Sequence, residues 1–332
     1  MEMKAAVLHK PMQLTIENVP EPKCNPDELL IKVHRSAICN STDTHIWNGT
    51  FRPYATPKMP HILGHECCGE VIEVGKECAH EYKIGDRVGF WVKMTGGFAE
   101  FNAIKPNCLG VCKLTDDLSY DEGALLELIC GTIRLIYDAG LHVGDKVLML
   151  GQGPAGLFLA QEARLTGVAR IYAVDLYDNR LEASKKIAAD DTLNLNGKSH
   201  EEAFDLLSQM VGRVDVVIDA MGDNRWSQGN SIDLALNLLK RHGKYMIFGH
   251  RGKNDSVNTQ LISNEDITMR GFEPGIAKTK ELTDFTVELV SQGRIKAAEL
   301  ITHHFPLEKL ENGLNKCLND LHDTIKVIID VA

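Results

Sequence analysis

The sequence lacks the features by which several broad classes of protein are recognised. It has no block of basic residues, and 36 lysine and arginine residues against 46 aspartate and glutamate residues give a formal charge of −10, so nucleic acid is not an expected partner. No apolar run reaches the ~18 residues that a membrane-spanning helix needs. The first residues contain no signal-peptide core, and we find no repeats or low-complexity segments.

Cysteine is present, but not in the pattern of a disulfide framework. Nine cysteines make an odd number, and their spacing is irregular, which favours reduced thiols. The paired Cys-x-x-Cys spacing of many structural zinc sites is also missing. Reduced thiols and the missing signal peptide together predict a cytoplasmic protein.

Length and strand pattern predict two domains in an α/β protein. A chain of 332 residues is long for one hydrophobic core. The first ~120 residues have the short alternating runs of a β-rich domain. From there on, strands alternate with helices, which is typical of a doubly wound parallel sheet covered on both faces. We expect the β-rich domain at 1–122 with 295–332, and the doubly wound domain at 123–294.

The expected elements follow from the same patterns. The strands expected in the first part are Ala5–Leu8, Gln13–Val19, Glu28–Arg35, Gly69–Gly75 and Arg87–Trp91. The helices expected later are Gly123–Ala139, Pro154–Leu165, Asn179–Ala189 and Leu307–Asn319, and the strands between and after them include Lys146–Leu150, Ala169–Asp175, Thr192–Leu195, Val214–Asp219, Lys244–Phe248 and Ile325–Val331.

One glycine-rich motif lies where a parallel sheet would bind a phosphate. It reads Gly151-Gln152-Gly153-Pro154-Ala155-Gly156, follows the apolar strand Lys146–Leu150 and opens the next helix. Gly151 would allow a tight turn, Gly153 would let the backbone approach a pyrophosphate, and Gly156 would let helix and strand pack closely. Free N–H groups at the helix N-terminus would then face the phosphates. The motif predicts a dinucleotide site.

Two charged residues beyond the motif bear on which dinucleotide binds. Asp175 ends the next strand, where a carboxylate accepts hydrogen bonds from the adenosine ribose and repels a 2′-phosphate. Arg180 lies nearby and could neutralise a phosphate. We expect NAD rather than NADP. The alternative is that the glycines only shape a turn and that Asp175 caps the helix that follows.

A second group of residues has the chemistry of a zinc site with one open position. Cys39 follows a strand pattern, and His65 and Glu66 follow Gly64. A thiolate, an imidazole and a carboxylate are donors of catalytic zinc, whereas a structural site uses four protein ligands, mostly cysteines. Glu66 would either bind the metal directly or orient a ligand. We expect a further ligand later in the chain, and Glu127 is the candidate.

The motifs of this chain resemble those of a known family. The chain is similar to zinc-dependent members of the medium-chain dehydrogenase/reductase superfamily, near the sorbitol, threonine and secondary-alcohol dehydrogenase branches. The resemblance covers essentially the whole chain. The residues that carry it are Ala37-Ile38-Cys39 with Asp43 and His45, Leu63-Gly64-His65-Glu66 with Gly69, Gly85-Asp86-Arg87-Val88, Gly96-Gly97-Phe98-Ala99-Glu100 and the Gly151–Gly156 turn.

The resemblance implies a GroES-like catalytic domain, a Rossmann domain and a catalytic zinc ion. Cys39 and His65 match the first two zinc ligands of the family, and Glu66 matches the adjacent glutamate. Glu127 falls where relatives carry a cysteine, aspartate or glutamate near zinc, and Cys130 is the competing candidate. Relatives are usually dimers or tetramers, so a homodimer or homotetramer is expected, joined through residues 240–275.

Three departures from the family pattern change what the resemblance implies. Val92-Lys93-Met94-Thr95 replaces the four-cysteine lobe of a structural zinc, so we expect one zinc ion per subunit. Relatives place the aspartate that corresponds to Asp43 one residue nearer to the cysteine, which leaves Ser41 and Thr42 as alternative proton-relay hydroxyls. The Arg-Tyr pair of sorbitol dehydrogenases is replaced by Glu273-Pro274-Gly275, which argues against sorbitol-type recognition of a polyol.

These residues predict hydride transfer between a secondary alcohol and NAD. Zinc would lower the pKa of the alcohol, Ser41 or Thr42 would pass its proton on, and His45 would exchange the proton with solvent. The substrate would be a polyol, a small secondary alcohol or a hydroxysteroid. The alternative is a zinc-free reductase of enones or quinones, whose members typically lack the Cys, Gly-His-Glu and acidic set. A non-enzymatic protein that keeps this fold has less support.

Overall fold

A computed structural model describes residues 1–52, 54–91, 96–106, 110–222, 226–227, 229–249, 256–272 and 280–332. The chain forms two compact units, Met1–Cys130 with Ala277–Ala332, and Gly131–Ile276. Helix α3 (Tyr120–Ala139) runs across the division. The domain ranges 1–122 with 295–332 and 123–294 stay a prediction, and the segments at 92–95 and 273–275 lie outside the described residues.

The first unit is built on two β-sheets. The smaller has the order β2-β1-β4, and the larger has the order β15-β16-β3-β5-β6-β8, with β7 paired to β3. In β3, Leu29, Ile31 and Val33 are fully buried and alternate with partly exposed neighbours, as expected for a strand with one face on the core. The strands of the two sheets are β1 Glu2–Lys10, β2 Gln13–Pro20, β3 Leu29–Ala37, β4 His61–Ile62, β5 Glu66–Val74, β6 Arg87–Trp91, β7 Phe101–Ile104, β8 Val111–Lys113, β15 Ile301–Pro306 and β16 Lys326–Asp330.

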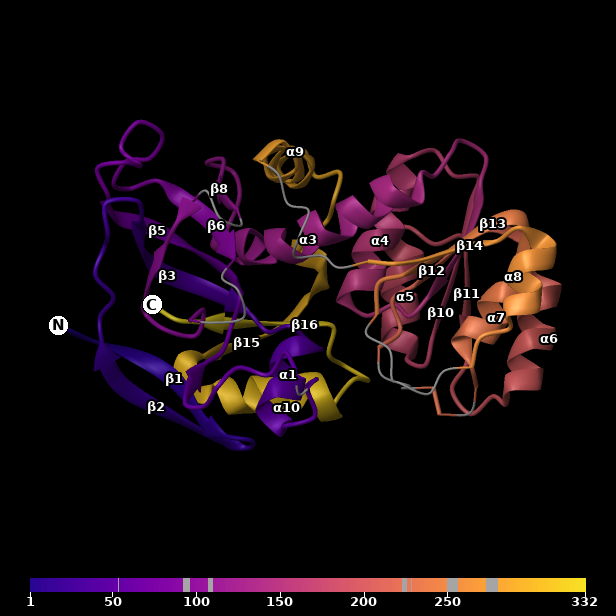
Figure 1. Ribbon diagram of the computed structural model, residues 1–332, viewed down its shortest axis with the longest axis horizontal. Helices are drawn as coiled ribbons and strands as arrows, with labels where there is room; N and C mark the ends of the chain where they lie inside the picture. Colours follow the sequence, from indigo (N-terminus) through magenta and orange to yellow (C-terminus); the bar gives the residue numbers. More distant parts are fainter. Residues whose placement is uncertain are drawn as a thin grey trace. The chain divides into compact units, whose positions relative to one another are not determined.

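The C-terminal segment completes the first unit. Strand β16 pairs antiparallel with β3, with Ile328 opposite Ala37. The backbone N–H of Ile38 donates to Val327 O at 3.0 Å. Helix α10 (Leu310–Asn319) lies beside α1 (Thr42–Asn48), as Figure 1 shows. The last strand therefore reaches the segment that begins with Cys39.

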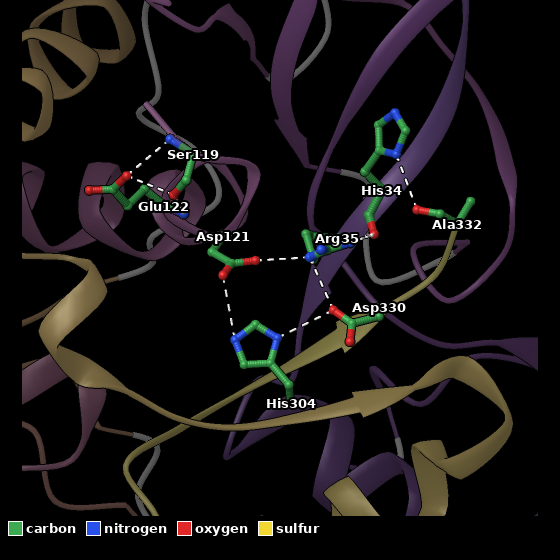
Figure 2. Close-up of polar contacts among 8 residues, drawn as sticks. All are labelled: His34, Arg35, Ser119, Asp121, Glu122, His304, Asp330 and Ala332. Carbon is green, nitrogen blue, oxygen red and sulfur yellow. Dashed lines mark hydrogen bonds and ion pairs between the residues drawn. The ribbon is translucent and has the colours of Figure 1, made fainter. Parts of the chain in front are cut away.

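A polar network joins the start of α3 to this sheet. Arg35 Nε lies 2.9 Å from Asp121 Oδ1 and 3.0 Å from Asp330 Oδ1. Figure 2 shows His304 between the same two carboxylates, with its nitrogens 3.4 Å from Asp121 Oδ2 and 3.3 Å from Asp330 Oδ1. Ser119 and Glu122 cap the helix reciprocally. These contacts position the first turns of α3, the helix that carries Glu127.

The second unit is a Rossmann-type sheet. Its order is β11-β10-β9-β12-β13-β14, and every neighbouring pair is parallel. In chain order this is the 3-2-1-4-5-6 arrangement of dinucleotide-binding sheets, in which the order reverses beside the first strand. The strands are β9 Lys146–Leu150, β10 Arg170–Asp175, β11 Asp191–Asn194, β12 Val214–Asp219, β13 Leu239–Ile247 and β14 Thr268–Gly271.

Helices cover both faces of this sheet. Helix α4 (Pro154–Leu165) and the C-terminal part of α3 pack on one face through Leu159, Ala163 and Ile136, and α5 (Asp178–Ile187) lies next to α4. Figure 1 shows α6 (His200–Val211), α7 (Ser231–Leu238) and α8 (Thr259–Glu265) gathered on the other side. The predicted α/β fold class, with a β-rich unit and a doubly wound unit, is confirmed.

The remaining elements add little to the site. Helix α9 (Lys280–Ser291) and the short helices η2 (Ala298–Leu300) and η3 (Leu307–Lys309) belong to the first unit. Among the described residues no helix is both long enough and apolar enough to cross a membrane. Each described cysteine is a free thiol, in agreement with the predicted reduced state.

Candidate active site

Three predicted metal ligands lie together in the first unit. The ligand atoms of Cys39, His65 and Glu66 are all within 4.8 Å of one another. Zinc bonds of ~2.0–2.3 Å in tetrahedral geometry would place such atoms roughly 3.3–3.8 Å apart. A small inward movement of these side chains would therefore close them around one ion. Sulfur, nitrogen and oxygen donors in this number suit a zinc ion with an open position.

The backbone around Gly64 explains how His65 reaches the cluster. Gly64 has φ +93°, and a Cβ atom there would lie 2.8 Å from Phe98 N. Gly97 N and Phe98 N donate to Gly64 O and Leu63 O at 3.0 Å. Close packing of these two backbone segments therefore requires glycine at this position and fixes the chain directly before His65.

Asp43 holds two of the three residues in place. Its Oδ1 lies 3.3 Å from His65 Nδ1, and its Oδ2 accepts a hydrogen bond from Cys39 N at 2.9 Å. Burial alone would lower the pKa of His65, but the charges of Asp43 and Cys39 raise that pKa well above its usual value. The electrostatic potential around His65 is therefore negative, which favours binding of a cation.

Lys326 contacts the metal cluster, and the sequence analysis did not single it out. Its Nζ lies 2.6 Å from Glu66 Oε2, with both side chains 1% exposed, and it donates to Ile38 O at 2.8 Å. Burial raises the pKa of Glu66, the charge of Lys326 opposes that change, and the charge of Glu127 adds to it. A lone lysine in the apolar run Ile325–Val331 was the available signal, because a buried lysine needs a partner.

The two candidates for a further ligand, Glu127 and Cys130, have different neighbours in the structure. Glu127 is close enough for its charge to raise the pKa of Glu66, whereas Cys130 acts in the same way on Cys112. Among the described residues the compact ligand group consists of Cys39, His65 and Glu66 alone. Ligation by Glu127 stays a prediction.

The candidate relay residues lie on or before α1. Thr42 N donates to Cys39 Sγ at 3.4 Å. Ser41 precedes the helix, and its buried Oγ has no hydrogen-bond partner among the described residues. His45 is in the last turn of α1. The three side chains are thus on one short segment that begins beside Cys39, and the choice between Ser41 and Thr42 stays open.

The glycine-rich turn has the form that a pyrophosphate requires. A Cβ on Gly156 would lie 1.9 Å from Gly151 O, so only glycine allows this approach of helix and strand. Gly153 precedes α4, and Pro154 begins the helix, followed by Ala155. A Cβ on Gly153 would meet no atom nearer than Arg180 Nη1 at 3.9 Å. The turn thus leaves room beside the N-terminus of α4, and the residues fit a dinucleotide.

Asp175 forms hydrogen bonds to the backbone on both sides of the sheet edge. Its Oδ2 accepts from Gln152 N at 2.5 Å, and its Oδ1 accepts from Leu176 N at 2.7 Å and Tyr177 N at 3.1 Å. Arg180 Nη1 lies 3.9 Å from Oδ2, with both side chains almost fully buried. The carboxylate therefore holds the glycine-rich turn against the end of β10. Its contact with a ribose stays a prediction.

Two family models match most of the chain. The one described as "Alcohol dehydrogenase GroES-like domain" matches residues 25–130, and the one described as "Zinc-binding dehydrogenase" matches residues 154–288. The first match contains the Cys39–His65–Glu66 cluster. The second begins at Pro154, inside the glycine-rich turn.

Whole-chain relatives agree with these matches. The sorbitol dehydrogenase of Bacillus subtilis strain 168 is 29% identical over 98% of this chain and 97% of its own length, and that of Ovis aries is 28% identical over 93% and 91%. The crystal structure of 2R,3R-butanediol dehydrogenase from Bacillus subtilis superposes with a TM-score of 0.84, at 25% identity and 99% coverage of both chains. The chain therefore belongs to the zinc-dependent branch of the medium-chain dehydrogenase/reductase superfamily.

Proposed function

We propose that this protein is a zinc-dependent, NAD(H)-linked dehydrogenase that interconverts a secondary alcohol and its ketone. The observation that carries the proposal is the group formed by Cys39, His65 and Glu66, whose ligand atoms lie within 4.8 Å of one another. The same chain contains a dinucleotide turn at the reversal point of a parallel sheet. Metal and dinucleotide sites together support redox chemistry on a hydroxyl group.

Cys39 and His65 would hold the zinc ion, with Glu66 or Glu127 as the carboxylate. Bound zinc supplies Lewis-acid chemistry that lowers the pKa of an alcohol hydroxyl. Asp43 keeps His65 oriented through Nδ1, which leaves Nε2 as the nitrogen for the metal. Thr42 N donates to Cys39 Sγ, a contact that would stabilise a zinc-bound thiolate.

The proton of the alcohol needs a path to solvent. A hydroxyl of Ser41 or Thr42 would take it, and His45 would exchange it with water, since imidazole titrates near pH ~6.5. The first two residues lie beside Cys39, and His45 is one turn further along α1. All three groups therefore lie within six residues of Cys39 in the sequence.

The cofactor would bind through the turn from Gly151 to Gly156. The open space at Gly153 and the N-terminus of α4 suit the pyrophosphate. Asp175, at the end of β10, favours a free 2′-hydroxyl over a 2′-phosphate. Arg180 is held near Asp175, which reduces its availability for a phosphate and supports NAD over NADP.

The relatives point to the class of substrate. Sorbitol and butanediol dehydrogenases are named for alcohols that carry several hydroxyls, so a polyol or a small secondary alcohol is the leading substrate class, with hydroxysteroids next. A homodimer or homotetramer remains part of the proposal.

A substrate panel tests the proposed function. NADH formation and oxidation would be measured with polyols, secondary alcohols, threonine and hydroxysteroids, with and without a zinc chelator, and with NADP as the control cofactor. We expect chelator-sensitive turnover on one class with NAD. Turnover of an enone or quinone that no chelator affects would instead establish the zinc-free reductase.

A further inference from the structure

Lys326 lies in an unusual place for a lysine. Its side chain is 1% exposed and lies against Glu66, which is equally buried. The ammonium group bridges two segments that are far apart in sequence, because it also donates to Ile38 O. Since Ile38 directly precedes Cys39, one buried cation touches the carboxylate of one metal-cluster residue and the backbone next to another.

The charges around Lys326 are mostly negative. Glu66 lies against Lys326 at 2.6 Å, and the side chain of Asp43 in the same cluster is buried as well. Buried charges of one sign are costly unless a counter-charge neutralises them. Among the described residues, Lys326 is the ammonium group that forms an ion pair with a residue of this cluster.

We propose that Lys326 is a built-in counter-cation that stabilises the metal-free site and competes with the metal ion for Glu66. The inference rests on the proposed function, because it requires that the cluster binds zinc. Before metal binding, Lys326 neutralises Glu66 and keeps the site folded. If Glu66 held a metal ion, the ion and the Lys326 ammonium group would both lie against one buried carboxylate, where like charges repel strongly. Lys326 therefore lowers the affinity for zinc.

The sign of the effect distinguishes this role from simple positioning. A residue that only orients Glu66 would help zinc to bind, and its removal would weaken binding. A counter-cation opposes zinc, so its removal strengthens binding while it destabilises the metal-free protein. Lys326→Met keeps most of the apolar stem and removes the ammonium group, with its charge and its bonds to Glu66 and Ile38 O.

The test uses the full-length protein and two readouts that do not depend on catalysis. Zinc affinity would be measured by competition with a chromogenic chelator, and the thermal midpoint would be measured with and without zinc. For Lys326→Met we expect zinc to bind about tenfold or more tightly, with a lower midpoint for the metal-free form. Lys4→Met is the matched control, because Lys4 forms an exposed ion pair with Glu308; it should change neither readout.

A second pair of variants keeps the test decisive if Lys326→Met does not fold. Glu66→Gln leaves Lys326 without its carboxylate, so zinc affinity should fall. The double variant Lys326→Met/Glu66→Gln removes both buried charges, and it should bind zinc more tightly than Glu66→Gln alone. Weaker or unchanged zinc binding on removal of Lys326 in both backgrounds would overturn the inference and leave the zinc site intact. A wild-type protein that binds no zinc would overturn the proposed function as well.

Discussion

Asp43 Oδ1 lies 3.3 Å from His65 Nδ1, and the other oxygen of the same carboxylate accepts from Cys39 N at 2.9 Å. One buried side chain therefore fixes the ring of one predicted metal ligand and the backbone of another. Groups of this kind hold ligands in the geometry that the metal requires.

Asp43→Asn should weaken zinc binding about 10–100-fold. The amide keeps the size of the side chain but loses the charge that orients the His65 ring. Zinc affinity is measured by chelator competition, with Asp27→Asn as control, because Asp27 pairs with Lys105 in an exposed position. Equal affinity of Asp43→Asn and the control would show that Asp43 has no role in metal binding.

Glu127→Ala and Cys130→Ala should differ in zinc content. The charge of Glu127 reaches Glu66, whereas Cys130 lies 1% exposed in the core and acts on Cys112. We expect purified Glu127→Ala protein to lose zinc during dialysis, and Cys130→Ala to retain about one ion per subunit while its stability falls. The reverse pattern, measured by elemental analysis, would make Cys130 the ligand.

Asp175→Ser should raise the KM for NAD and destabilise the second unit. The carboxylate accepts three backbone N–H groups within 3.1 Å, so its loss loosens the glycine-rich turn as well as any contact with the ribose. Steady-state kinetics with NAD and NADP and a thermal unfolding curve measure both effects. Unchanged NAD kinetics would refute a role in binding the ribose.

Glu162 gives a prediction about pH. It lies on α4 with 3% exposure, and its Oε1 is 2.7 Å from Thr132 Oγ1. Burial raises its pKa well above the usual 4.5, and the Thr132 hydrogen bond opposes this only in part. The folded state therefore holds a proton that the unfolded state releases, so the free energy of unfolding falls as pH rises above 4.5.

Glu162→Gln removes this pH dependence and keeps a group that can bond to Thr132. The variant should match the wild type near pH 4.5 and become more stable than it above that pH. The gain should be up to about 1.4 kcal/mol per pH unit, until the folded-state pKa is passed. Urea unfolding at several pH values measures the difference. Two curves that stay parallel from acid to neutral pH would contradict this account.

Site residues that stand in short sequence motifs could be predicted. Lys326 could not, because its place in the site depends on the pairing of strands far apart in the sequence. Cys39, His65 and Glu66 stand in recognisable motifs, and they do lie together. Lys326 is 288 residues from Ile38, whose carbonyl it binds, and only the antiparallel pairing of β16 with β3 brings them together. No local pattern encodes which buried residue a lysine will meet.

For Asp175, the position could be predicted from the sequence, but its hydrogen bonds could not. Its position at the end of the second Rossmann strand was predictable from alternation and from the glycine motif. Its bond to Gln152 N was not, because it depends on how closely β9 and β10 end beside each other. Asp175 does not cap α5, whose N-cap is Tyr177, and its bond to the turn is compatible with contact to a ligand.

Reversible removal of zinc tests the central claim most directly. NADH formation from an active secondary alcohol would be followed before chelation, after chelation and after zinc is added back, with zinc content measured at each stage. The account predicts one zinc ion per subunit, loss of turnover when it is removed and recovery when it returns. Full turnover by protein that contains no zinc would contradict it.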